Sequence, residues 1–172
     1  FEGLTVAGSH GGYIFHALGA DADVLDAMPV TITPGTVRVY VLSKVGDGTA
    51  SPELLQKVLA ALSPDDVRPM NDTVEVASAE VLRFAIKAQL RLYPGPASAS
   101  ALERAGTALA AYLSSCRRLG YDVADSGTKG ALHVRGVQKV ILESPVDDVV
   151  VQPHQVAFCT GVDIQLVEGS HV

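Results

Sequence analysis

Hydrophobic and polar positions near the start of the chain follow first a helical and then a strand period. Residues 9–18 predict a short helix, whose apolar face consists of Tyr13, Ile14, Ala17 and Leu18. Residues 30–43, VTITPGTVRVYVLS, predict a hairpin, because Pro34-Gly35 suits the centre of a type II turn. The strand after this turn has one buried and one outer face, because Val37, Val39 and Val41 alternate with Arg38, Tyr40 and Leu42.

A helix and a third strand are predicted next. Ser51 suits a helix N-cap and Pro52 the first helical position, and Ser63-Pro64 ends the helix. The apolar stripe of this helix consists of Leu54, Leu55, Val58, Leu59 and Leu62. A strand with Val74 and Val76 inward follows, so residues 23–77 predict the order strand, strand, helix, strand.

The same layout begins again near residue 80. Residues 82–92 alternate throughout, with Leu82, Phe84, Ile86, Ala88, Leu90 and Leu92 on one face and Arg83, Ala85, Lys87, Gln89 and Arg91 on the other. Ser100 and Glu103 fit a capping box. The helix after it has an apolar side of Leu102, Ala105, Leu109, Tyr112 and Leu113. The pattern ends with a short helix over 127–134 capped by Ser126, a strand over 137–142, and a strand that alternates at Val162, Ile164 and Leu166.

These elements predict an α+β fold of two small tandem domains, each with a strand-helix-strand layout and a mainly antiparallel sheet. We expect the boundary near Ala79, with the first domain over 23–79 and the second over 80–172. The chain starts at Phe1 without a Met or a signal-peptide pattern, which favours a start inside a longer gene product. Residues 1–22 are therefore expected to be an N-terminal helical segment, the remnant of a preceding domain.

Composition and charge narrow the possible functions. Of the 172 residues, 48% are hydrophobic and 19% are charged, so a packed core is expected. The net charge is −6 and no basic face is visible, so we expect no nucleic-acid partner. No apolar run reaches the roughly 20 residues of a spanning helix, and no membrane partner is expected. Cys116 and Cys159 are expected to be free thiols in a reducing compartment, with a single disulfide as the alternative.

Residues 45–51, VGDGTAS, are the candidate ligand loop. They follow a strand and precede a helix, where backbone N–H groups can bind an anion. However, neither GxGxxG nor the Walker pattern is present, and Asp47 would repel a phosphate. A plain connecting loop is favoured, and a small-molecule-binding module of ferredoxin-like layout with its ligand at residues 45–51 is the alternative.

The other polar clusters lack the spacing of a metal or catalytic site. Asp21, Asp23 and Asp26 begin like a calcium loop, but Ile32 stands where the bidentate Glu is required. Asp147-Asp148 has the composition of a turn. No ligand spacing joins the five histidines to one another or to a cysteine: His10, His16, His133, His154 and His171. We therefore predict no enzyme, no cofactor, and no catalytic, cofactor-binding or metal-binding residue.

The polar segment 63–76, SPDDVRPMNDTVEV, has two interpretations. Asp65 and Asp66 are neighbours in an extended segment and point in opposite directions, so they do not converge on a substrate. This favours a structural seam between a helix and a strand. The alternative is an acyl- or phosphoryl-cleaving enzyme that uses Arg68 and Asn71.

The same region carries a family resemblance. Residues 61–81, ALSPDDVRPMNDTVEVASAEV, which follow VRVYVLS and SPELLQKVLAAL, resemble the phage baseplate J-like family, as found in the baseplate assembly proteins of P2-like contractile-tailed phages. The resemblance also includes YIFHALGADADVLDAMPVTITPGTVRVYVLS, RLYPGP, RRLGYDV, HVRGVQKVILESPVDDVVV and FCTGVDIQL. It covers nearly the whole chain in the same order, and the chain is similar to the C-terminal portion of such proteins.

The resemblance implies a structural role rather than catalysis. We expect a wedge or ring subunit of a contractile phage tail baseplate, which forms a homo-oligomer, most simply a dimer within a wedge, and contacts other wedge and hub proteins. The implied location is the virion tail baseplate, after assembly in the bacterial host cytoplasm. On this interpretation Arg68-Pro69 and Asn71-Asp72 form a turn into a strand, and no cofactor is implied.

One strand face is a candidate contact surface. Arg83, Lys87 and Arg91 form a basic stripe on the face of residues 82–92 that lies opposite the core. Such a stripe would suit an acidic patch on another subunit, in a contact that weakens with salt. A solvated outer face is the alternative.

Overall fold

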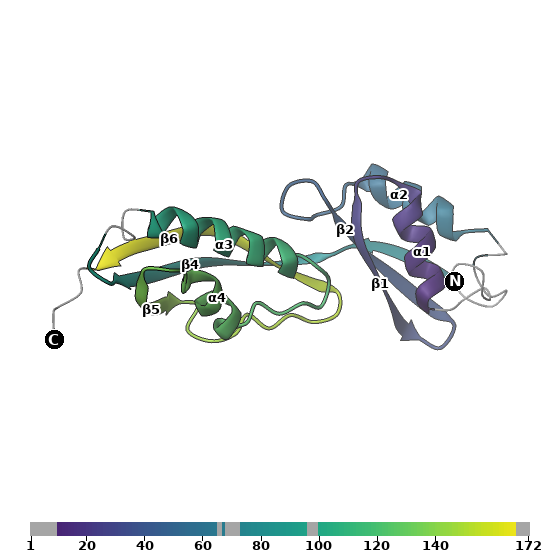
Figure 1. The fold of residues 1–172 in the computed structure, drawn as a ribbon. Coiled ribbons are helices and arrows are strands. Elements are labelled where there is room, and N and C mark those ends of the chain that lie inside the picture. Colours follow the sequence, from purple (N-terminus) through teal and green to yellow (C-terminus); the bar gives the residue numbers. More distant parts are fainter. Residues whose placement is uncertain (1–9, 65–66, 68–72, 96–99, 168–172) are drawn as a thin grey trace. The chain divides into compact units, whose positions relative to one another are not determined.

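The computed structural model describes residues 10–64, 67, 73–95 and 100–167 (Figure 1). The described part contains helices packed on two three-stranded sheets, which confirms the predicted α+β class. The chain divides into two compact units, and antiparallel pairing predominates in their sheets. Among the described residues, no helix is both long enough and apolar enough to cross a membrane.

The first unit contains one three-stranded sheet with two helices. Its elements in chain order are α1 (His10–Ala20), β1 (Val24–Thr33), β2 (Thr36–Ser43), α2 (Pro52–Leu62) and β3 (Thr73–Ser78). β1 and β2 form an antiparallel hairpin whose turn holds Gly35 at φ 80°, as the Pro-Gly pair predicts. β2 pairs with β3 in parallel, and α2 makes the crossover between them. The predicted order of strand, strand, helix, strand is confirmed.

The core of the first unit lies between the helices and one face of the sheet. Its buried members include Tyr13, Ala17, Val39, Val41, Leu54, Val58 and Leu62. The hydroxyl of Ser51 accepts a hydrogen bond from the Leu54 N–H at 3.2 Å, which confirms the predicted N-cap. Leu59, predicted as part of the buried stripe, is instead 40% exposed, because it lies beyond the arc of α2 that faces the sheet.

The opposite face of the same sheet is also partly covered, which was not predicted. Leu42 is fully buried against Leu119 and Val156, although its place in the alternation assigned it to the outer face. The cover comes from residues 118–120 and 151–156, which belong to the first unit despite their late position in the chain. A hydrogen bond from the Leu119 N–H to Asp26 Oδ2 at 3.1 Å fixes one of these segments.

The limits of the units differ from the expected domain ranges. The first unit comprises Phe1–Val81, Arg118–Gly120 and Val151–Val156, so α1 is grouped with it instead of standing apart as the segment 1–22. α1 packs against both β1 and α2, and its Tyr13 is 2% exposed. The ranges 23–79 and 80–172 as independent domains remain a prediction.

The second unit contains the other sheet. Its elements are β4 (Glu80–Leu92), α3 (Ala101–Cys116), α4 (Asp125–Leu132), β5 (Val137–Ser144) and β6 (Gln155–Val167), of which the first residues of β4 and β6 fall in the first unit. The strand order is β5-β4-β6. The core is formed by Ile86, Ala88, Leu90, Ala101, Ala105, Leu109, Leu132 and Val137. The alternation predicted for residues 82–92 is confirmed at its centre, whereas Leu82 is 38% exposed.

Ser100 occupies the N-cap position of α3 as predicted, but neither the side-chain cap expected there nor the cap expected at Ser126 is formed. Ser100 makes no side-chain cap to α3, because its hydroxyl binds the guanidinium of Arg104 instead. The predicted apolar face of α3 is confirmed at Ala105, Leu109, Tyr112 and Leu113. Leu102 is instead 39% exposed, and Ala101 is buried. α4 begins at Asp125, which places Ser126 inside the helix rather than before it.

The last strand is longer than predicted. β6 begins at Gln155 and not at Val162. Val162 and Leu166 alternate as predicted, but each is 48% exposed. Ile164 between them packs against the core of the second unit.

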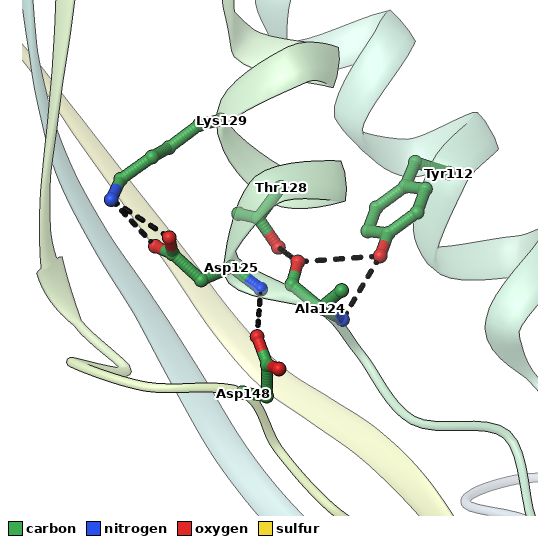
Figure 2. A network of polar contacts seen from close by, with 6 residues as sticks. All are labelled: Tyr112, Ala124, Asp125, Thr128, Lys129 and Asp148. Carbon is green, nitrogen blue, oxygen red and sulfur yellow. Dashed lines mark hydrogen bonds and ion pairs between the residues drawn. The ribbon is translucent and has the colours of Figure 1, made fainter.

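Tyr112 joins α3 to the start of α4 (Figure 2). Its hydroxyl accepts a hydrogen bond from the Ala124 N–H at 3.1 Å and lies 3.3 Å from the Ala124 carbonyl oxygen, to which it donates. A Cβ built on Gly127 would overlap the Tyr112 ring. Gly127 is therefore required for the close approach of the two helices, whereas a Cβ on Gly130 in the same helix meets no atom within 4 Å.

We expect Gly127→Ala to lower the free energy of unfolding by about 1–3 kcal/mol, because the tyrosine ring must move out of its packed position. Gly130→Ala is the matched control, and it should stabilise the protein by up to about 1 kcal/mol, because alanine favours the helix. Urea unfolding followed by circular dichroism measures both. Equal effects of the two substitutions would contradict the close packing.

Candidate interaction surfaces

Half of the polar seam, residues 63–76, lies outside the described residues. Those outside are Asp65, Asp66, Arg68, Pro69, Met70, Asn71 and Asp72. Val67 within the seam is described: it is 6% exposed, packs in the first core, and its N–H donates to the Pro64 carbonyl oxygen at 3.0 Å. The described part of the seam therefore contributes to packing.

In the candidate ligand loop at residues 45–51, backbone N–H groups donate hydrogen bonds to side-chain oxygens of the same chain. The Val45 N–H donates to Ser43 Oγ at 3.0 Å, the Thr49 N–H to Asp47 Oδ1 at 3.0 Å, and the Ala50 N–H to Ser78 Oγ at 2.9 Å. These N–H groups are the donors that an anion would need. Their side-chain acceptors occupy them already, which weighs against a phosphate ligand here.

The helix that follows this loop also satisfies its own N-terminus. Ser51 caps α2, and Glu53 is in its first turn. A hydrogen bond from the backbone N–H of Glu53, and a second from Ser51, lower the pKa of the Glu53 carboxyl. The positive end of the helix thus has a carboxylate from the chain itself.

The aspartates that resemble the start of a calcium loop hold the backbone in place. Asp21 Oδ1 accepts from the Asp23 N–H at 2.9 Å, and Asp21 Oδ2 pairs with Lys57 Nζ at 2.5 Å. The bond from Lys57 lowers the pKa of Asp21. Asp26 accepts from the N–H groups of Ala27 and Leu119. Over the part of the chain that the structure describes, no three His, Cys, Asp or Glu side chains gather to hold a metal ion.

The Asp147-Asp148 turn has a role that the sequence did not reveal (Figure 2). Val123 and Val149 pair through two backbone hydrogen bonds of 3.0 and 2.9 Å. This pairing brings Asp148 Oδ1 to 2.7 Å from the Asp125 N–H, at the first residue of α4. Asp148 thus caps the N-terminus of α4, the role that the sequence analysis assigned to Ser126. The sequence pattern did not indicate this cap, because 23 residues separate the acceptor Asp148 from the donor Asp125.

The same turn borders a shallow depression in the second unit. An opening of about 370 Å³ is lined by Asp125, Val146, Asp147, Asp148 and Val150. Lys129 pairs with Asp125 at 2.8 Å, one helical turn along α4 (Figure 2). Val146 and Val150 are 77% and 61% exposed.

A polar row crosses the outer face of the first sheet. Arg38 on β2 and Glu75 on β3 are register partners, joined by bonds of 2.9 and 2.7 Å to Glu75 Oε2. Tyr40, the next outward residue of β2, has its ring 5.0 Å from that of His154, and His154 Nε2 lies 3.3 Å from Glu80 Oε2. Hydrogen bonds to Tyr40 and to Glu75 raise the pKa of Arg38. Charged groups on this face are thus paired within the chain.

The predicted basic stripe of β4 is partly neutralised by its own sheet. Lys87 pairs with Glu143 of β5 at 3.0 Å, and this bond raises the pKa of Lys87. Gln89 also binds Glu143. Arg91 is half-buried and lies beside Lys139 in the strand register. The stripe is therefore better described as a mixed-charge face, in which Glu143 compensates Lys87 while Lys139 adds positive charge beside Arg91.

Where the structure describes them, the cysteines and the remaining histidines join no group that could hold a metal ion. Cys116 is buried and Cys159 is half-buried, and both are free thiols, as expected. His10 borders a groove of about 140 Å³ with Tyr13, Pro29, Thr31 and Val37. His171 lies outside the described residues.

Comparison with known proteins agrees with the family resemblance. Residues 5–78 match the family model of the Baseplate J-like central domain. This segment is a Baseplate J-like central domain. It contains α1, the whole first sheet and the crossover helix α2.

A curated relative extends the similarity over most of the chain. Baseplate protein J of Escherichia phage P2 is 44% identical over 160 residues, which are 93% of this chain and 53% of that protein. The predicted resemblance is thus confirmed beyond the Baseplate J-like central domain. The chain spans about half the length of the curated relative it matches.

We expect Asp148→Ala to lower the free energy of unfolding by about 1 kcal/mol, because the Asp125 N–H at the start of α4 loses its acceptor. Asp147→Ala changes the neighbouring exposed carboxylate and should stay within about 0.5 kcal/mol of the parent chain. Urea unfolding at neutral pH compares them. An Asp147 effect as large as that of Asp148 would show that the turn, and not the cap, matters.

Alkaline pH should weaken the contact made by Tyr112. Burial, followed by a hydrogen bond with Cys116, raises the pKa of Tyr112 above its ordinary value of 10.0. The unfolded chain therefore loses this proton first, so the stability from Tyr112 is complete below about pH 10 and decreases as the pH rises toward the folded pKa. The stability difference between the parent and Tyr112→Phe should shrink above that pH in urea titrations. Tyr121→Phe, at a 53% exposed tyrosine, should show no such trend.

Proposed function

We propose that this chain is a structural subunit of a contractile phage tail baseplate. The observation that carries the proposal is the 44% identity to phage P2 baseplate protein J across 93% of the chain. Identity at this level, spread over both units, supports a shared fold and a shared place in the tail. The Baseplate J-like central domain supports the same role for the first unit.

The internal use of polar groups supports a structural role over a catalytic one. Asp21, Asp26, Asp47 and Asp148 each accept a hydrogen bond from a backbone N–H and so stabilise turns, a strand and a helix start. A catalytic carboxylate would instead point at a substrate position. On this proposal the protein is not an enzyme, and Arg68 and Asn71 belong to a structural seam.

Within the baseplate, the proposed role is that of a wedge or ring subunit. Such a subunit associates with copies of itself and with other wedge and hub proteins, resides in the virion tail, and is assembled in the host cytoplasm. The mixed-charge face of β4 and the polar row of the first sheet carry compensated charges. Faces of this kind suit contacts between subunits that remain soluble before assembly.

Immunogold electron microscopy of tail particles tests this role. Antibodies against the chain are applied to purified particles from cells that express the gene, with antibodies against the sheath protein as the positional control. We expect gold at the end of the tail distal to the head and the chain in mass spectra of the same particles. Sheath-containing particles without the chain, while it accumulates in the cytosol, would refute the proposal.

A further inference from the structure

The edge of the second sheet at β6 is long and unprotected beyond Gln155, whose carbonyl oxygen accepts a hydrogen bond from the Gly120 N–H at 2.9 Å. Among the described residues, β6 pairs with β4 on one side and with no strand on the other. Its 13 residues, QVAFCTGVDIQLV, contain no Pro, Lys or Arg. Exposed strand edges are usually protected by such residues, because unpaired N–H and C=O groups recruit other strands. The edge strand β1 of the other sheet has this protection, since Pro29 lies in its middle.

The second half of β6 exposes apolar side chains along this edge. Val162, Ile164 and Leu166 share the face that packs toward the helices, because side chains alternate along a strand. Ile164 contacts the core, while Val162 and Leu166 are each 48% exposed. The described residues of the chain thus leave the apolar face of this strand half covered.

The opposite face of the same segment is polar. Asp163 and Gln165 lie two residues apart, and Gln165 Nε2 is 3.4 Å from Asp163 Oδ2. Lys87 is near enough for Asp163 to raise its pKa, after the larger effect of Glu143. Asp163 is the only charged residue in β6.

Two copies of the segment 162–166 are complementary when they pair in one particular antiparallel register. If a two-fold axis passes through Ile164, then Val162 of one copy lies beside Leu166 of the other, and apolar groups meet twice. Asp163 then lies beside Gln165 of the second copy, where a carboxylate can accept from an amide. Directly opposed side chains of these kinds stabilise an antiparallel pair.

Neighbouring registers lack this match. An axis through Asp163 would place two carboxylates directly opposite each other, which is destabilising. An axis through Gln165 would place Asp163 beside Val167 of the second copy, where the carboxylate gains no partner. Only the register centred on Ile164 satisfies both faces of the segment.

We propose that β6 pairs with β6 of a second copy of this chain, antiparallel and centred on Ile164, so that two three-stranded sheets become one of six strands. The contact is isologous, because the same surface is used by both copies. This inference rests on the proposed function, since it names the surface by which the baseplate subunit associates with itself.

A charge-rescue experiment tests both the surface and the register. The dimer constant of the chain is measured by sedimentation equilibrium for the parent, Val162→Glu, Leu166→Lys and the double variant. Each substitution occurs twice in a two-fold dimer, so each single variant should weaken association roughly tenfold or more. In the double variant Glu and Lys face each other across the axis twice, and association should recover.

Rescue inside one chain is ruled out by geometry. Positions 162 and 166 lie four residues apart on one strand, or about 13 Å, so the two new charges cannot pair within a copy. Val150→Glu introduces the same charge at a 61% exposed valine in the turn before β6 and should leave association unchanged. Circular dichroism checks that each variant folds.

Hydrogen exchange supplies a second measurement that needs no variant. Amide exchange of residues 161–167 should slow as the protein concentration rises, because dimerisation occupies the outward N–H groups. A parent chain that stays monomeric at every concentration, with unchanged exchange in this segment, overturns the pairing.

If the chain forms a dimer that neither single substitution weakens, the pairing through β6 is also rejected. The chain then associates with itself through another surface. If both single variants weaken association and the double variant does not restore it, the register centred on Ile164 is rejected. The proposed function is judged separately by the immunogold position of the chain, so a misplaced dimer surface and a mistaken role give different results.

Discussion

Leu42 is buried against Leu119 and Val156. This contact explains why residues 118–120 and 151–156 belong to the first unit. A three-stranded sheet with helices on one face leaves its other face in water. Here that face is covered by two short segments that come about 75 residues or more after the strand they cover. Burying one leucine fully contributes about 1.5–3 kcal/mol. The segment 118–120 is also joined to the sheet by the hydrogen bond from the Leu119 N–H to Asp26, so packing and hydrogen bonding act together there.

Part of the acidic composition of the chain serves to hold its backbone in place. Several of its aspartates accept hydrogen bonds from backbone N–H groups at bends, in a strand or at a helix start: Asp21, Asp26, Asp47 and Asp148. A buried or semi-buried N–H without an acceptor destabilises a fold, and a charged acceptor makes the stronger bond. Carboxylates that resemble a ligand set in the sequence are thus already occupied in the structure.

Local signals in the sequence predicted the elements well, and distant partners explain what it missed. Pro34-Gly35 and Ser51-Pro52 act within a few residues, and both form the turn and the cap expected of them. The cap of α4 was assigned to Ser126 because Asp148 lies too far along the chain to be recognised. The helix start after Ser100 was predicted correctly, but the capping box is not formed because the Ser100 hydroxyl binds Arg104. No catalytic or binding residue was predicted, and the alternative site at Arg68 and Asn71 lies outside the described residues.

The interleaving of the two units has a consequence for how such proteins can evolve. The chain passes from one unit to the other after residues 81, 117, 120, 150 and 156. A recombination event that joined the first 78 residues, the limit of the Baseplate J-like central domain, to an unrelated partner would remove both covering segments and expose Leu42. Exchange of gene segments is therefore expected to move the two units together. The two segments that cover one face of the first sheet therefore link the inheritance of the two units.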